Sequence, residues 1–78
     1  MSEPKLREVF VKSLCIAADY PLDDLRYRGI EEWDSVAHMT LVSGLEEAFD
    51  IMLETNDVID LSSYLKAKEI LSKYGVHF

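Results

Sequence analysis

The chain has 78 residues, which is the size of one domain, and its hydrophobic content of 49% is normal for a globular protein. Fifteen acidic residues against eight basic ones give a net charge of −7, which argues against nucleic acid as a partner because phosphate binding needs clustered Lys and Arg. So short a chain also leaves little room for an enclosed catalytic pocket. We therefore expect a single carrier, binding or interaction domain over residues 1–78 rather than a self-sufficient enzyme.

The first periodic segment predicts a helix from about Glu3 to Ala17. Ser2 and Pro4 are typical of a helix start, and Tyr20-Pro21 ends the segment because proline disfavours a helical residue before it. The apolar residues at helical spacing are Leu6, Val9, Phe10, Leu14 and Ala17.

Cys15 is the only cysteine, so no internal disulfide can form, which fits a reducing compartment. Its position beside Leu14 on the apolar side of this helix predicts a buried, inert thiol rather than a nucleophile. The sequence shows neither a signal peptide nor an apolar run long enough to span a membrane. We therefore expect a cytoplasmic protein without a membrane partner.

A long connection follows, from about Asp19 to Trp33. It carries apolar residues at regular intervals, and we expect them to pack the loop down on the helices: Leu22, Leu25, Tyr27 and Ile30. A loop of this length inside a small domain is often functional.

The second helix is the clearest, since Asp34 and Ser35 are both good cap residues. Apolar residues then recur every three or four positions: Val36, Met39, Val42, Leu45 and Phe49, with Leu41 beside them. Gly44 within a helix costs about 1 kcal/mol relative to alanine, so we expect close packing there.

A short third helix is predicted from about Asn56 to Leu61, presenting Val58, Ile59 and Leu61. A fourth is predicted from about Ser63 to Tyr74, with Ser62 and Ser63 at its start and Gly75 ending it. Nothing alternates with a period of two. The predicted fold is all-α, a small four-helix bundle with three main helices, one short third helix and a long first loop.

The acidic residues are concentrated in one part of the chain. From Gly29 to Asp60 there are nine acids and no Lys or Arg. Such a segment is either a solvated surface or a docking face for basic partners, and charge alone leaves both open. The stretch from Asp50 to Leu61 lacks the central glycine and the alternating ligands of a calcium loop, so we expect no metal there.

The segment Trp33-Asp34-Ser35-Val36 stands where the long loop meets the second helix, and taken alone it indicates only a helix cap. Its context resembles the acyl carrier protein family, closely over residues 33–63 and more loosely over the whole chain. That family has an Asp-Ser-Leu attachment motif, a helix ending in Leu-Glu-Glu-x-Phe, an acidic link, a small third helix and paired hydroxyls opening the last one. The matching segments here are Asp34-Ser35-Val36, Leu45-Glu46-Glu47-Ala48-Phe49, Asp50 to Asp57, Val58 to Leu61, and Ser62-Ser63.

The resemblance implies that Ser35 accepts 4′-phosphopantetheine from coenzyme A, installed by a separate phosphopantetheinyl transferase that uses Mg²⁺. Asp34 would be the motif aspartate that orients the transferase and its metal. The chain itself would perform no catalysis. His38, three residues after Ser35, could meet the phosphate of the arm or be an exposed structural bystander. We expect Trp33 to pack against the loop.

The resemblance also implies acyl- or aminoacyl-loading ligases, synthases or transferases as partners, with basic docking surfaces, and a monomeric carrier. The expected partner-facing residues are Val36, Met39, Ser43, Glu46, Glu47 and Asp57. Ala37 and Thr40 stand where many members of the family carry acids, which argues against the standard fatty-acid synthase enzymes as natural partners. The resemblance implies a role in fatty-acid-like, polyketide or other secondary-metabolite or polysaccharide biosynthesis.

Two other hypotheses stay open. The chain could be an unmodified helical protein-interaction module that retains the carrier fold, although such a module has no need of Ser35. A free-standing enzyme is disfavoured because the sequence offers no acid–base or metal constellation. Residues that could shelter a cargo, or simply form the core, are Phe10, Leu14, Val42, Leu45, Ile59 and Ile70.

Overall fold

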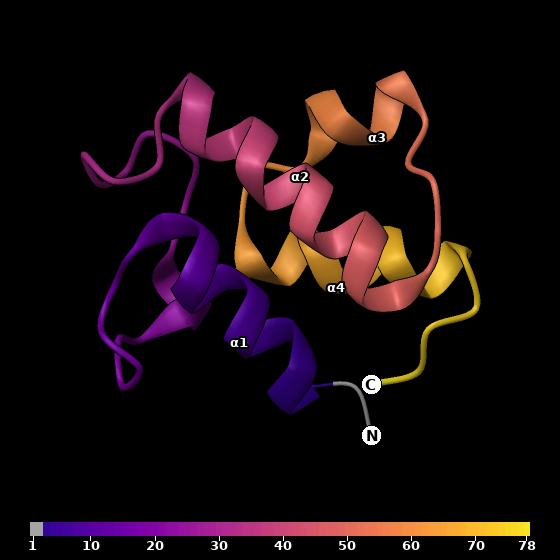
Figure 1. Ribbon diagram of the computed structural model, residues 1–78, viewed down its shortest axis with the longest axis horizontal. Helices are drawn as coiled ribbons and strands as arrows, with labels where there is room; N and C mark the ends of the chain where they lie inside the picture. Colours follow the sequence, from indigo (N-terminus) through magenta and orange to yellow (C-terminus); the bar gives the residue numbers. More distant parts are fainter. Residues whose placement is uncertain (1–2) are drawn as a thin grey trace.

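The computed structural model describes residues 3–78, and these form four α-helices, one short 3₁₀ turn and no strand (Figure 1). The elements are α1 (Glu3–Leu14), η1 (Leu22–Asp24), α2 (Ser35–Phe49), α3 (Thr55–Asp60) and α4 (Tyr64–Lys73). The predicted all-α fold with three main helices and a short third one is confirmed. The start signal expected at Ser2 lies outside the described residues. Within residues 3–78, no helix is both long enough and apolar enough to cross a membrane.

The starts of α2 and α4 follow from capping side chains, as predicted. The Asp34 carboxylate accepts the Ala37 N–H at 2.9 Å, and the Ser63 hydroxyl accepts the Lys66 N–H at 3.0 Å. Each cap satisfies one of the backbone donors that a helix start leaves without a partner. Gly75, with φ of 90°, ends α4 in the left-handed conformation that glycine tolerates best.

The end of α1 differs from the prediction. The helix stops at Leu14 because Cys15 adopts a left-handed backbone conformation with φ of 55°. The Ile16 N–H then turns back to donate to the Val11 carbonyl at 3.2 Å. The prediction of a buried thiol was therefore wrong, since Cys15 is exposed beyond the helix. Ala17, expected on the apolar face, is exposed as well.

The core lies where α1 packs along α2 and α4 closes the other side (Figure 1). Gly44 sits at the contact between α1 and α2. A Cβ atom at Gly44 would lie 3.1 Å from Ser13 Oγ and 3.1 Å from a Val9 methyl, so glycine permits the close approach that was predicted. The largest fully buried side chains are Trp33, Tyr64, Phe10, Leu6, Leu14, Leu22, Leu41, Leu45, Leu61 and Leu71.

The long loop packs down on the bundle, as predicted, with Leu22 and Leu25 buried. The middle of the loop, at residues 25–27, is hydrogen-bonded to the start of α4. The Tyr27 N–H donates to the Ser62 carbonyl at 2.8 Å, and the Tyr64 N–H donates to the Leu25 carbonyl at 3.4 Å. The loop that leads to Trp33 is thus hydrogen-bonded to residues at the start of α4.

The prediction for α3 is confirmed for Leu61, which is buried, and for Val58, which packs against the core, and it is wrong for Ile59. Ile59 is 73% exposed, whereas Asp57 is only 4% exposed. Lys73 Nζ and the Tyr74 hydroxyl both donate to the Asp57 carboxylate, and the Tyr74 oxygen also accepts the Glu54 N–H at 3.1 Å. Ile59 lies about 200° farther round the helix, since each residue advances the helix by about 100°. Asp57 is therefore not part of an exposed docking surface, and Ile59 is not part of the core.

Substituting Asp57→Asn tests this buried carboxylate. Hydrogen bonds from Lys73 and then Tyr74 lower the pKa of Asp57 from its ordinary value of 3.8. A lowered native pKa contributes stability above the unfolded-state value and loses it as the pH falls toward the native value. The variant should melt at a lower temperature than the wild type at neutral pH, and the difference should shrink as the pH falls below 3.8.

Thermal denaturation followed by circular dichroism across this range measures the effect. Asp60→Asn is the matched control, because Asp60 is an exposed acid on the same helix. A difference between Asp57→Asn and the wild type that does not change with pH would contradict the assignment.

Candidate functional site

The structure separates the roles of the two residues that the sequence left as alternative caps. Asp34 is the cap of α2, and its carboxylate is engaged with the Ala37 N–H. Ser35 is the first residue of the helix, and its side chain is exposed. Capping therefore makes no demand on the Ser35 hydroxyl, which faces solvent at the start of a 15-residue helix.

Two side chains of the long loop meet this hydroxyl. Arg28 Nη2 donates to Ser35 Oγ at 3.1 Å, and the Tyr27 hydroxyl lies 3.2 Å from the same oxygen. Arg28 Nε also donates to the Tyr27 hydroxyl at 3.4 Å. The guanidinium, and to a smaller degree the Ser35 hydroxyl, lowers the pKa of Tyr27 by donating to its oxygen. The three groups form one hydrogen-bonded cluster around Ser35 Oγ.

The sequence pattern indicates Tyr27 only as an apolar residue of the loop and does not indicate Arg28. Periodicity carries no signal for such a contact, because it depends on how the loop folds back. The usable signal was charge, since Arg28 is the last basic residue before the segment from Gly29 to Asp60 that has none.

The backbone holds Arg28 in place. Its φ of 62° is left-handed, which costs roughly 1–2 kcal/mol for a residue with a side chain. The Arg28 N–H donates to the Trp33 carbonyl at 3.1 Å, and the Trp33 N–H donates to the Ile30 carbonyl at 3.2 Å. Residues 28–33 therefore close on themselves, which brings Arg28 back beside the first residue of α2.

Trp33 is the fixed point of this arrangement, with 0% of its surface exposed. Its ring makes edge-on contacts with Phe10 of α1, at 5.6 Å between centroids, and with Tyr27 of the loop, at 6.0 Å. The predicted packing of Trp33 against the loop is confirmed. Its indole N–H donates to His38 Nδ1 at 3.0 Å, which joins the loop to α2.

His38 has an internal role. Because an indole N–H can only donate, His38 Nδ1 must accept, and Nε2 then carries the ring proton. That proton is donated to the Val58 carbonyl of α3, with Nε2 and the oxygen 2.9 Å apart. The ring is partly buried and stacks with Trp33. Both nitrogens are engaged, so the structure supports neither a phosphate ligand nor an exposed bystander at His38.

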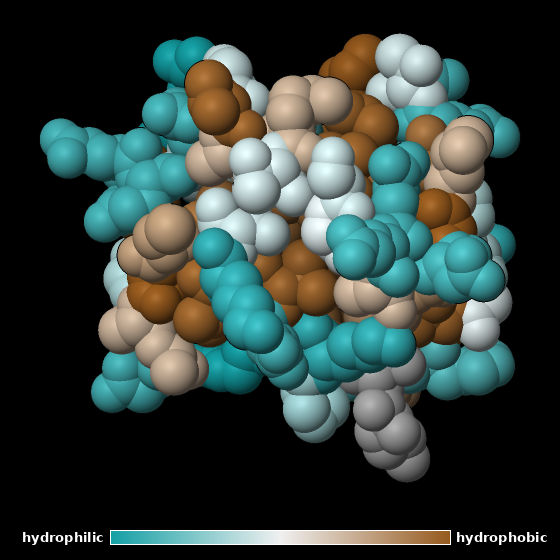
Figure 2. All heavy atoms as spheres, in the orientation of Figure 1, coloured by the Kyte–Doolittle hydropathy of each residue, from teal (hydrophilic) through white to brown (hydrophobic). Residues whose placement is uncertain are grey.

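The expected partner-facing residues divide into two groups. Val36 and Met39 are 77% and 55% exposed, and Ser43 and Glu47 are exposed too. Glu46 is half-buried, and its carboxylate accepts the Leu53 N–H at 2.9 Å. Figure 2 shows apolar atoms at the surface over the start of α2 and over α3, and more of them between α1 and α2. The exposed surface in the first turns of α2 is therefore apolar, while exposed acids lie on both sides of it along the chain, at Glu31, Glu32 and Asp34 before Ser35 and at Glu47 after it.

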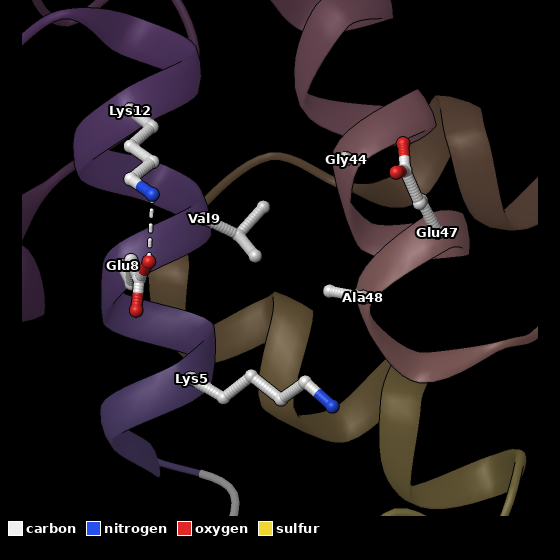
Figure 3. Close-up of a pocket in the computed structure, with 7 residues that line it drawn as sticks. All are labelled: Lys5, Glu8, Val9, Lys12, Gly44, Glu47 and Ala48. Carbon is white, nitrogen blue, oxygen red and sulfur yellow. Dashed lines mark ion pairs between the residues drawn. The ribbon is translucent and has the colours of Figure 1, made fainter.

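A groove of about 340 Å³ lies between α1 and α2 (Figure 3). The side chain of Lys5 extends from α1 toward α2, and Glu8 pairs with Lys12 at 2.8 Å on the α1 side. Gly44, in the α2 wall, is nine residues beyond Ser35, or about 14 Å along the helix axis. The groove is thus separate from the Ser35 cluster. Among residues 3–78, no three His, Cys, Asp or Glu side chains gather in a way that could hold a metal ion.

Substituting Trp33→Phe tests the junction that carries the site. The change leaves His38 Nδ1 without its donor, and an unsatisfied buried group costs about 1–3 kcal/mol. We expect the free energy of unfolding to fall by at least about 1 kcal/mol in urea denaturation at neutral pH.

A double-mutant cycle with His38→Ala isolates the hydrogen bond from the loss of ring volume. Because the two side chains touch, the two substitutions should be non-additive by at least about 0.5 kcal/mol. Strict additivity would rule out the Trp33–His38 bond as a contributor to stability.

Comparison of the chain with protein-family models, with curated proteins and with solved structures finds no match. The functional assignment therefore rests on the sequence pattern and on the geometry around Ser35.

Proposed function

We propose that this chain is an acyl carrier protein that bears 4′-phosphopantetheine on Ser35. The observation that supports the proposal is the exposed Ser35 hydroxyl, which caps nothing, stands at the start of α2 and is contacted by a guanidinium. The small all-helical fold and the sequence pattern from Trp33 to Ser63 agree with it.

The attachment chemistry requires little of the chain. Ser35 Oγ forms a bond to the phosphorus that bears the pantetheine in coenzyme A, and the bond from that phosphorus to the bridging pyrophosphate oxygen breaks. Adenosine bisphosphate leaves, and the hydroxyl proton passes to a base of the transferase. The carrier supplies only an accessible oxygen in a fixed position, so no catalytic base beside Ser35 is needed.

The residues around Ser35 fit a phosphodiester. Its negative charge would lie beside the Arg28 guanidinium and the positive end of the α2 dipole. Once attached, the arm supplies a terminal thiol on which an acyl or aminoacyl group is held as a thioester. Asp34, besides capping α2, has an exposed position from which it can meet the transferase and its Mg²⁺.

Partner enzymes would approach the surface around Ser35. Val36 and Met39 provide exposed apolar contacts in the first turns of α2, and Glu47 provides a charge farther along the same helix. Such a surface suits loading ligases, synthases and transferases that combine an apolar contact with basic residues. Biosynthesis of a fatty-acid-like, polyketide or polysaccharide product is the corresponding setting.

Intact-mass measurement tests the proposal. Incubating the protein with coenzyme A, Mg²⁺ and a broad-specificity phosphopantetheinyl transferase should raise its mass by one phosphopantetheine unit. Fragmentation should place that unit on Ser35, because its hydroxyl is exposed and free of capping.

Ser35→Ala should gain no mass, whereas Ser62→Ala, which removes another exposed serine, should be modified like the wild type. If several transferases leave the wild type unmodified, the unmodified interaction module becomes the better account of this fold.

A further inference from the structure

The cation nearest to the proposed attachment oxygen comes from the loop rather than from α2. Arg28 places one N–H of Nη2 on Ser35 Oγ and its Nε–H on Tyr27. A guanidinium carries five N–H donors in a planar fork, so the remaining donors of Arg28 can take other oxygens at the same place.

We propose that Arg28, assisted by the Tyr27 hydroxyl, holds the phosphate of the arm against the loop and so fixes the direction in which the arm leaves Ser35. This inference rests on the proposed function, because it concerns the same attachment site.

Modification changes what the cluster can bind. When Ser35 Oγ becomes an ester oxygen it loses its proton and becomes a weak acceptor. The phosphodiester charge resides on two other oxygens attached to the same phosphorus, next to Oγ. The guanidinium now donates to a neutral hydroxyl oxygen, whereas a phosphodiester offers it two oxygens that share a negative charge and can be bound bidentately. The guanidinium that now contacts Oγ therefore gains a stronger acceptor beside it.

The surroundings of Ser35 are acidic, so a cation at this place would offset repulsion of the phosphate. The phosphate would be added in a segment with nine acids and no Lys or Arg, directly after Asp34. Lys12 borders a shallow groove that reaches Asp34 and Val36, but its ammonium pairs with Glu8 at 2.8 Å. Arg28 is the cation that the structure places on Ser35 itself.

The loop is built to keep Arg28 there. Its strained backbone, with φ of 62°, is held by the N–H bond to the carbonyl of buried Trp33. In Arg28→Gln the strain of the left-handed backbone is unchanged, because glutamine also has a Cβ atom. The substitution removes the positive charge and the planar set of guanidinium donors. Arg26→Gln is the matched control, since Arg26 is an exposed arginine of the same loop two residues earlier.

The experiment compares three loaded proteins, the wild type, Arg28→Gln and Arg26→Gln, each confirmed by intact mass. The ³¹P transverse relaxation of the arm phosphate reports how firmly it is held. In the wild type we expect fast relaxation, close to that of the folded domain. In Arg28→Gln it should slow toward that of a freely moving phosphodiester, and Arg26→Gln should match the wild type.

Equal relaxation in all three loaded proteins would overturn the role of Arg28 and leave the carrier proposal intact. Failure of the wild type to load would overturn both. If only Arg28→Gln resists loading, the ³¹P relaxation of the loaded wild type is measured at low salt and at 1 M NaCl. The Debye length is about 3 Å at 1 M, so the salt should weaken the contact and relaxation of the wild-type phosphate should slow. Relaxation that does not respond to salt would overturn the inference.

Discussion

The burial of Trp33 is the constraint on which the rest of the structure depends. Its ring is fully enclosed and touches Phe10 and Tyr27 edge-on, which joins α1 to the long loop. Edge-on aromatic pairs contribute roughly 0.5–1.5 kcal/mol beyond the area they bury. Through its N–H, Trp33 also fixes His38, which in turn donates to the Val58 carbonyl of α3. The side chain of Trp33 thus connects α1, the loop and α2 directly, and α3 through His38.

This junction explains how a surface serine can have a defined position. Ser35 follows Trp33 by two residues, with Asp34 between them as the helix cap. The carbonyl of Trp33 also anchors the backbone of Arg28, whose side chain returns to Ser35 Oγ. The Ser35 hydroxyl therefore stands next to the best-buried junction of the fold, and under the proposed function the flexibility that a carrier needs would come from the arm. The exposed apolar side chains of Val36 and Met39 follow Ser35 in the first turns of the same helix.

The features that could be predicted from the sequence are those set by neighbouring residues, such as helix ends and apolar helix faces. Cap residues and the spacing of apolar side chains located the start of α2 and both ends of α4 within about one residue, and Gly44 indicated a close helix contact. The errors came from contacts between distant parts of the chain or from unusual backbone. Cys15 ends α1 in a left-handed conformation, and the sequence has no glycine at this position to indicate a helix end. Asp57 is buried because Lys73 and Tyr74 arrive from α4, and Arg28 reaches Ser35 only because the loop closes on itself.

Under the proposed function, Ser35 carries a cargo-bearing arm in the cell. The most direct test is the intact mass of the protein isolated from the cells that make it, before and after treatment with hydroxylamine. We expect one phosphopantetheine on Ser35, with part of the population bearing an additional group that hydroxylamine removes, as expected for a thioester. Recovery of the protein with Ser35 unmodified under every growth condition would rule out the proposed function.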